Sequence, residues 1–274
     1  MCIRDRHTFD FKNRTAIVTG GAQGFGLDVA KRFLDSGAKV FIWDIDENLL
    51  KRVIDEIKNP NLQFNVVDVA NYKDVERNVY EITSKINIDI LINNAGITGP
   101  TGPLWEYDVE TWNKIVQINL MGTFNCCRAI VPNMIKHNYG RIVNVASVHG
   151  IQIIPNCFPY PVAKHGVIGL TKALAVDYAA KGIKINSISP GYIDTPIIER
   201  FFKTKPDPDA ARKEAENHQP IKRMGTTDEI ANTIMFMSSD ECNYMIGANI
   251  VVDGGITLRT VSYTHLTLPT KRIV

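Results

Sequence analysis

The stretch Arg14-Thr15-Ala16-Ile17-Val18-Thr19-Gly20-Gly21-Ala22-Gln23-Gly24-Phe25-Gly26 is a short apolar run that leads directly into a glycine-rich turn. A run of this length bounded by turn residues predicts a buried strand, and a helical pattern begins after the glycines. Glycine permits positive φ and close approach of the backbone to a pyrophosphate, while the next helix offers unpaired N–H groups to an anion. Many turns need glycine, so the turn predicts a phosphate site only in combination with the next elements of the chain.

A second apolar run at 39–43 predicts another strand, with Asp44 at its carboxyl end. Asp44 lies 18 residues after Gly26, close to the roughly 20 expected for an acidic residue that accepts hydrogen bonds from an adenosine ribose. The alternative is that Asp44 helps to cap the helix that starts near Asp46. Strand, glycines, helix, strand and acid in this order favour dinucleotide binding.

The rest of the chain alternates between short apolar runs and helical patterns. Strands are expected at 62–67, 89–92, 140–146, 183–188 and 249–252, and long helices at 111–137, 162–180 and 227–238. This alternation predicts a single-domain, Rossmann-type, doubly wound α/β fold with a parallel sheet of about seven strands. Ligands of such sheets bind beyond the carboxyl ends of the strands. The residues expected at that edge are Gly20, Asp44, Asp68, Asn93 and Ser147.

Tyr160 and Lys164 stand four residues apart at the start of a helical pattern, with Ser147 a short loop upstream. If the helix is already formed there, the phenol and the ammonium lie on one face. A free tyrosine has a pKa of about 10, and a nearby cation favours the phenolate. The spacing therefore predicts a proton-transfer pair. The alternative is a surface tyrosine beside a solvated lysine.

The glycine turn has the spacing T-G-x-x-x-G-x-G, formed by Thr19, Gly20, Gly24 and Gly26. Together with several motifs further along the chain, this spacing resembles the short-chain dehydrogenase/reductase family over residues 10 to 258. Phe25 and Pro161 differ from the residues usual in that family. The other matching motifs, in chain order, are Asp68-Val69, Asn93-Asn94-Ala95-Gly96, Asn119, Ser147, Tyr160 with Lys164, and Pro190-Gly191 with Thr195.

The resemblance implies a catalytic set. Tyr160 would be the general acid or base, and Lys164 would lower its pKa and hold the nicotinamide ribose. Ser147 would donate a hydrogen bond to the substrate oxygen. Asn119 would fix a water that links Lys164 to solvent; alternatively, it is a helix-interior asparagine at a bend. The cofactor residues implied are Gly20, Gln23, Gly24, Phe25, Gly26, Asp44, Asp68, Val69, Asn93, Ala95, Gly96, Tyr160, Lys164, Pro190, Gly191, Ile193 and Thr195.

Cofactor choice depends on Asp44, which would bond an unmodified ribose and repel a 2′-phosphate. No basic residue neighbours it in the sequence, and Ala22 and Gln23 replace the basic residues of NADP-preferring relatives. The sequence predicts NAD as cofactor, with NADP less favoured, and no metal.

The walls of the substrate pocket are expected to come from residues 97–107, 149–158 and 195–221. The first two stretches supply the polar candidates Thr98, His149, Gln152 and Cys157. His149 could instead bond only to backbone. Within the last stretch, the charged, proline-containing region 203–218 is either a lid over the substrate or a solvated face. Polar groups among aromatic walls favour a hydroxylated substrate.

We therefore expect an NAD-dependent oxidoreductase that interconverts a secondary alcohol and a ketone or lactone, on a sugar, polyol or sugar acid. An NADPH-dependent 3-oxoacyl-thioester reductase shares almost every motif and is the alternative enzyme. A catalytically silent NAD-binding protein is the alternative outside catalysis.

Composition favours a small-molecule partner and a cytoplasmic location. With 31 basic and 29 acidic side chains the net charge is +2, which favours neither nucleic acid nor an anionic membrane. No apolar stretch approaches the roughly 20 residues of a membrane span. Five cysteines without a C-x-x-C pair favour a reducing compartment. The resemblance implies a homo-tetramer with one domain at 9–258, and the segments 1–8 and 261–274 are expected to be non-native or disordered tails.

Overall fold

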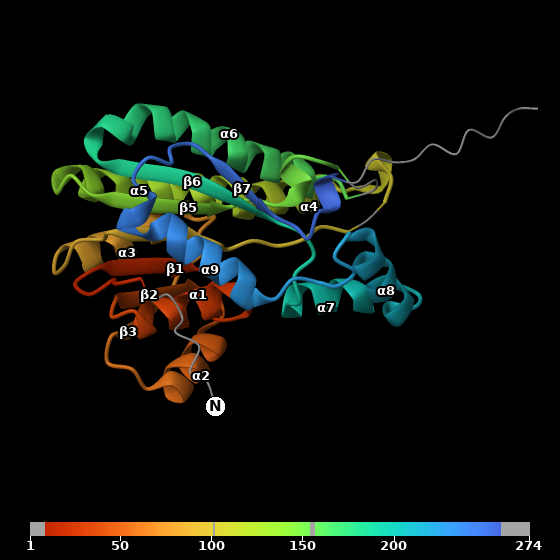
Figure 1. Ribbon diagram of the computed structural model, residues 1–274, viewed down its shortest axis with the longest axis horizontal. Coiled ribbons are helices and arrows are strands. Elements are labelled where there is room, and N and C mark those ends of the chain that lie inside the picture. The colour runs from red at the N-terminus through yellow and green to blue at the C-terminus, as the bar shows by residue number, and fades with distance from the viewer. Residues whose placement is uncertain (1–8, 101, 154–156, 259–274) are drawn as a thin grey trace, which may run out of the picture.

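The computed structural model of the chain describes residues 9–100, 102–153 and 157–258. These residues contain one parallel sheet of seven strands in the order β3-β2-β1-β4-β5-β6-β7 (Figure 1). The two predicted tails lie outside the described residues. The strands are β1 (Thr15–Thr19), β2 (Lys39–Asp44), β3 (Leu62–Val66), β4 (Ile90–Asn93), β5 (Gly140–Val145), β6 (Ile183–Pro190) and β7 (Asn249–Val252).

The strand order reverses between β1 and β4, which pair in the middle of the sheet. From β1 the chain moves outward through β2 to β3, and from β4 it moves in the opposite direction to β7. The loops after β1 and β4 therefore diverge and leave a crevice at their carboxyl ends, the usual ligand position in a doubly wound sheet. The predicted fold class is confirmed.

Helices cover both faces of the sheet (Figure 1). Buried residues of α1, α2 and α9 form one core with Ala16 and Val18 of β1. Buried residues of α3, α5 and α6 form a second core with Ile17 of the same strand. Successive strand residues point to opposite faces, so an uninterrupted apolar strand is what two helical layers require. The helices are α1 (Gly24–Asp35), α2 (Glu47–Ile57), α3 (Tyr72–Thr83), α4 (Val109–Val116), α5 (Gly122–Lys136), α6 (Tyr160–Tyr178), α7 (Pro196–Lys203), α8 (Pro208–His218) and α9 (Thr227–Ser238).

Two predicted helices differ from the structure in ways that concern the site. The helix expected at 111–137 is divided by a π-helical segment, Gln117–Met121, between α4 and α5. The helix expected from 162 begins two residues earlier, so that Tyr160 is already helical. The charged segment 195–221 forms α7 and α8, which project from one side of the sheet (Figure 1).

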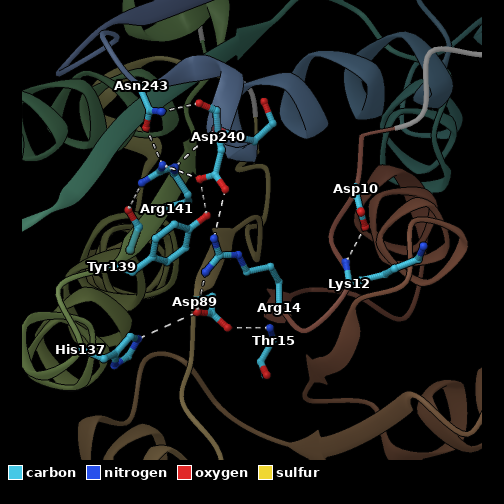
Figure 2. A network of polar contacts seen from close by, with 12 residues as sticks. Asp10, Lys12, Arg14, Thr15, Asp89, His137, Tyr139, Arg141, Asp240 and Asn243 are labelled. Carbon is cyan, nitrogen blue, oxygen red and sulfur yellow. Dashed lines mark hydrogen bonds and ion pairs between the residues drawn. The ribbon is translucent and has the colours of Figure 1, made fainter.

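The amino ends of the strands are joined by a polar network (Figure 2). Arg141 of β5 is 3% exposed, and its Nη2 donates to Asp240 Oδ1 at 2.8 Å. Arg14 donates to the other oxygen of Asp240 at 3.0 Å and lies 3.5 Å from Asp89. The ring of Tyr139 lies between the two guanidiniums. Its centroid is 3.6 Å from Cζ of Arg14 and 4.5 Å from Cζ of Arg141. These contacts link the segments at the amino ends of β1, β4 and β5 to one another.

Within the part of the chain that the structure describes, no helix has the length and apolarity needed to cross a membrane.

Candidate active site

The glycine turn after β1 has the backbone that its sequence requires. Gly20 and Gly24 have φ of +61° and +58°, a region that side chains other than hydrogen disfavour. A Cβ on Gly26 would lie 2.4 Å from both the Asn94 amide nitrogen and the Gly20 oxygen. The next helix, α1, begins at this turn without a side-chain cap. Its first N–H groups are therefore available to an anion, and the turn fits a dinucleotide diphosphate.

A cavity at this turn, here called the glycine-turn cavity, extends to the ends of β2 and β3. Asp44, Asp68 and Val69 line it, while their contacts with an adenosine ribose and an adenine stay predictions. Oxygens of the Asp44 carboxylate accept from the backbone N–H groups of Ala22 at 3.4 Å and Asp46 at 3.2 Å. The residues lining the cavity are Gly20, Gln23, Gly24, Phe25, Gly26, Trp43, Asp44, Ile45, Val67, Asp68, Val69, Asn94, Ala95, Gly96, Ile97, Thr98, Ile118, Thr195, Pro196, Ile197 and Arg200.

The prediction for Asn93 needs correction. Its side chain is 4% exposed, and Nδ2 donates to Asn144 Oδ1 at 2.8 Å in the interior. Because strand side chains alternate, the next residue faces the other way. Asn94 lines the cavity, and its Nδ2 donates to the oxygens of Thr19 and Gly20 at 2.9 and 3.0 Å. Asn94, which was not among the predicted cofactor residues, thus ties the glycine turn to the loop after β4.

Ser147, Tyr160 and Lys164 lie together in a second cavity, here called the tyrosine cavity, that adjoins the first. Ser147 follows β5 and caps the 3₁₀ turn Val148–Gly150, which packs against α6. Tyr160 is the first residue of α6 and Lys164 follows one turn later, so both side chains lie on one face of the helix. Three elements thus bring the predicted serine, tyrosine and lysine to one place.

The protonation of this pair differs from the expectation. Burial raises the pKa of Tyr160 to about 12, and a hydrogen bond with Ser147 only partly offsets the increase. Burial also lowers the pKa of Lys164 to about 8. The Lys164 Nζ donates to the Val145 oxygen at 2.8 Å and lies 5.6 Å from the centre of the Tyr160 ring. Burial is thus the largest influence on the pKa of Tyr160, and Lys164 does not produce the lowering that the sequence predicted.

Asn119 lies in the π-helical segment and is fully buried. Its Oδ1 accepts from the Ile97 N–H at 3.2 Å, and its Nδ2 donates to the oxygens of Ile97 and Ile115, each at 3.0 Å. The side chain therefore holds the loop after β4 against the helix. Asn119 sits at a helix irregularity, as the alternative interpretation of the sequence expected, and it also lines the tyrosine cavity. Its role in fixing a water beside Lys164 stays a prediction. Short π segments occur often at functional sites.

Three of the four predicted substrate residues line the tyrosine cavity: Thr98, His149 and Cys157. Gln152 does not line it and is exposed, because the 3₁₀ turn after Ser147 directs the chain outward. His149 lies within that turn. Its ring packs edge-on against Tyr160 with centroids 5.7 Å apart. Burial, with a smaller effect of His165, lowers the pKa of His149 to about 4, so the ring is neutral at physiological pH.

The segment after β6 supplies the remaining wall. Pro190, Gly191, Ile193 and Thr195 line the tyrosine cavity, and the Thr195 side chain caps α7. Their predicted contacts with the cofactor stay predictions. Sequence reasoning missed the apolar contribution of this segment, although the α7 sequence has a clear apolar face. The additional lining residues are Tyr192, Ile197, Ile198 and Phe201. Among the described residues, no cluster of three or more His, Cys, Asp or Glu side chains is arranged to hold a metal.

The chain is similar to known proteins in both sequence and structure. The family model described as Enoyl-(Acyl carrier protein) reductase matches residues 20–257. The 2-dehydro-3-deoxy-L-rhamnonate dehydrogenase (NAD(+)) of Sphingomonas sp. is 36% identical over 248 residues, which cover 90% of this chain and 96% of that protein. The 3-oxoacyl-[acyl-carrier-protein] reductase of Chlamydia muridarum is also 36% identical, covering 89% of this chain and 97% of its own. The crystal structure of levodione reductase has a TM-score of 0.87 at 35% identity and covers 91% of this chain and all of that one (100%).

Proposed function

The chain belongs to the short-chain dehydrogenase/reductase family, and on that basis we propose that it is an NAD-dependent oxidoreductase that interconverts a secondary alcohol and a ketone or lactone. One observation carries the proposal: Ser147, Tyr160 and Lys164 line a cavity that adjoins the glycine-turn cavity. When bound, a nicotinamide would supply the site that gives or takes a hydride. The protein must then bind the substrate oxygen and move one proton.

The three side chains divide that work. The Tyr160 hydroxyl donates a proton to the carbonyl oxygen in reduction and removes it from the alcohol in oxidation. The Ser147 hydroxyl donates a hydrogen bond to the same oxygen and stabilises its developing charge. Lys164, held by Val145, binds the ribose hydroxyls next to the nicotinamide and carries a positive charge below its pKa of about 8.

For the cofactor we propose NAD, because Asp44 lines the glycine-turn cavity where a 2′-phosphate would meet a second negative charge. The test is kcat/KM with each cofactor, measured on wild type and Asp44→Ala. We expect wild type to prefer NAD and the variant to lose most of that preference. A wild-type preference for NADP would refute this choice.

The substrate class that we propose is a sugar, polyol or sugar acid. The polar groups of Thr98, Ser147 and His149 offer hydrogen bonds around the reacting oxygen. The similarity to a dehydrogenase of a deoxy-sugar acid supports the same class. Apolar side chains of α7 would then cover carbon atoms without hydroxyl groups.

One observation favours the alternative enzyme, a reductase of 3-oxoacyl thioesters: Ile197, Ile198 and Phe201 give the tyrosine cavity an apolar wall that suits an acyl chain. A panel of sugars, sugar acids, simple secondary alcohols and 3-oxoacyl thioesters, monitored by absorbance of the reduced nicotinamide, separates the two. Turnover of hydroxylated substrates with NAD supports the proposal, and turnover confined to thioesters with NADPH replaces it. Tight NADH binding without turnover of any substrate would point to a silent binding protein.

We further propose one domain at 9–258, a homo-tetramer and a cytoplasmic location. Val176 on α6 is 80% exposed and Tyr244 is fully exposed, as expected of apolar side chains that another copy covers. Light scattering during gel filtration tests the tetramer. The four cysteines free of disulfides among the described residues, Cys126, Cys127, Cys157 and Cys242, suit a reducing compartment.

A further inference from the structure

We propose that Arg200 of α7 binds the diphosphate of the dinucleotide and thereby docks α7 and α8 over the cofactor. This inference rests on the proposed function, because it requires a dinucleotide in the glycine-turn cavity. Neither the glycine motif nor the catalytic motifs point to Arg200. Its position among the side chains that line that cavity singles it out.

The start of α7 lies directly on the glycine turn. A Cβ on Gly24 would find Thr195 and Pro196 as its nearest neighbours, at 3.9 Å. One turn further along α7, the Arg200 Nη1 donates to the Gln23 Oε1 at 3.5 Å. Gln23 precedes α1, whose first N–H groups face the predicted diphosphate position. The guanidinium is thus next to the place where the helix would meet the phosphates.

The charges of the glycine-turn cavity leave a role for one cation. Among the described residues that line it, the charged side chains are Asp44, Asp68 and Arg200. A diphosphate adds about two further negative charges, and backbone N–H groups offset only part of them. A guanidinium binds phosphate through two parallel N–H donors, which makes it the best-suited side chain for this position.

The present partner of Arg200 is weak. Gln23 is a neutral amide at 3.5 Å, the long limit of a hydrogen bond, and Arg200 is exposed. By contrast, Arg212 of α8 pairs with the Asp194 carboxylate at 2.7 Å, and Arg223 pairs with Glu229 at 2.7 Å. Arg200 can therefore exchange its partner for a phosphate at little cost.

Binding at Arg200 would affect the substrate cavity, because α7 also carries Ile197, Ile198 and Phe201. The two helices are joined by a small core of Phe202, Ala215 and Met224, so they are expected to move together. Binding of the diphosphate at Arg200 would thereby fix this wall of the tyrosine cavity.

The experiment measures Kd for NADH, ADP-ribose and adenosine by calorimetry on wild type, Arg200→Gln, Arg200→Lys and Lys203→Gln. Lys203 is the matched control, since it is an exposed cation of the same helix that does not line the cavity. We expect Arg200→Gln to raise Kd for NADH and for ADP-ribose about tenfold, in line with the loss of one charge-assisted pair. Arg200→Lys should raise both Kd values less than Arg200→Gln does, because it keeps the positive charge. Adenosine, which lacks phosphate, should bind all four proteins alike.

Hydrogen exchange tests the docking of α7 and α8. ADP-ribose should protect backbone amides of residues 196–218 in wild type and not in Arg200→Gln. If wild type binds ADP-ribose and Arg200→Gln binds it within twofold of wild type, the inference is wrong while the proposed function stands. Equal protection in both proteins would overturn the docking. If wild type binds neither NADH nor ADP-ribose, the proposed function fails and the inference with it.

Discussion

Burial acts on Tyr160 and Lys164 in opposite directions. It favours the neutral form of each, so the pKa of Tyr160 rises to about 12 and that of Lys164 falls to about 8. At neutral pH the phenol keeps its proton and the amine keeps its charge. A protonated phenol is ready to act as acid in ketone reduction, whereas alcohol oxidation requires its deprotonation and should become faster as the pH rises.

The role of the phenol can be isolated by Tyr160→Phe. We expect kcat to fall about 10³-fold, because a general acid–base group contributes roughly 10²–10⁴, while Kd for NADH stays within about twofold. Stopped-flow turnover and NADH fluorescence give the two numbers. Tyr192→Phe is the control, since Tyr192 lines the same cavity and its pKa is also raised to about 12 by burial. Comparable losses in both variants would show that the cavity needs hydroxyl groups in general and no specific proton donor.

The buried ammonium of Lys164 should lower stability. The folded protein releases this proton near pH 8 and the unfolded chain near 10.5, so below pH 8 the unfolded state binds it more tightly. The penalty is on the order of 3 kcal/mol at pH 7 and disappears as the pH rises from 8 to 10.5.

We therefore expect Lys164→Met to be inactive and yet about 1–3 kcal/mol more stable than wild type at pH 7, after the lost bond to Val145 is allowed for. The gain should shrink at pH 9.5. Urea unfolding at both pH values measures it, with the exposed Lys172→Met as control. A variant less stable than wild type at pH 7 would contradict the assigned cost of burial.

Among the elements, the π-helical segment Gln117–Met121 positions a side chain that holds a loop of the site. It places Asn119 where three hydrogen bonds reach Ile97 and Ile115. The loop containing Ile97 lines both cavities. One side chain therefore sets the position of a loop that is expected to contact cofactor and substrate.

Replacing Asn119 by Ala should lower the free energy of unfolding by about 2–4 kcal/mol, since it leaves buried backbone groups unpaired and opens a cavity. Kd for NADH should rise as well. Asn78→Ala is the control: Asn78 is equally a buried helical asparagine, but its amide bonds only to Asp74 of its own helix. Chemical denaturation and NADH titration check both variants. An unchanged Kd in Asn119→Ala would separate the loop from cofactor binding.

The sequence predicted the elements well because their signals are local. The apolar runs, the glycine spacing and the i,i+4 relation of Tyr160 and Lys164 all lie within a few residues of one another. The errors concern where side chains point and which distant segments meet. Strand alternation turns Asn93 inward and Asn94 toward the cavity, a shift of one residue that sequence spacing does not resolve. Arg200 reaches Gln23 across 177 positions, and no local pattern encodes that contact.

At the scale of the whole molecule, the two edges of the sheet have separate tasks. The carboxyl ends of the strands carry the cavities, and the amino ends carry the network of Arg14, Tyr139, Arg141 and Asp240 (Figure 2). Burial alone would raise the pKa of Asp240, but hydrogen bonds from Tyr139 and Arg14 lower it below its usual value. The carboxylate therefore stabilises the fold above the pKa of an unfolded aspartate, and that stabilisation is lost as the pH falls through the lower, folded-state pKa.

Asp240→Asn tests this separation. The side chain of Asp240 is 58% exposed, so solvent screening limits its ion pairs, but Arg141 is buried and would lose its charged partner. We expect the free energy of unfolding to fall by about 1–2 kcal/mol at pH 7, with the difference from wild type decreasing in strong acid as the carboxylate becomes protonated. Because the network lies at the far edge of the sheet from the cavities, kcat and Kd for NADH should not change. Urea unfolding as a function of pH, beside steady-state kinetics, measures both. The control is Asp228→Asn, which removes the partner of Arg32, an arginine that is more exposed than Arg141, and it should cost less than about 0.5 kcal/mol. A loss of turnover in Asp240→Asn with a normal free energy of unfolding would mean that the two edges are coupled, and the division of tasks would have to be abandoned.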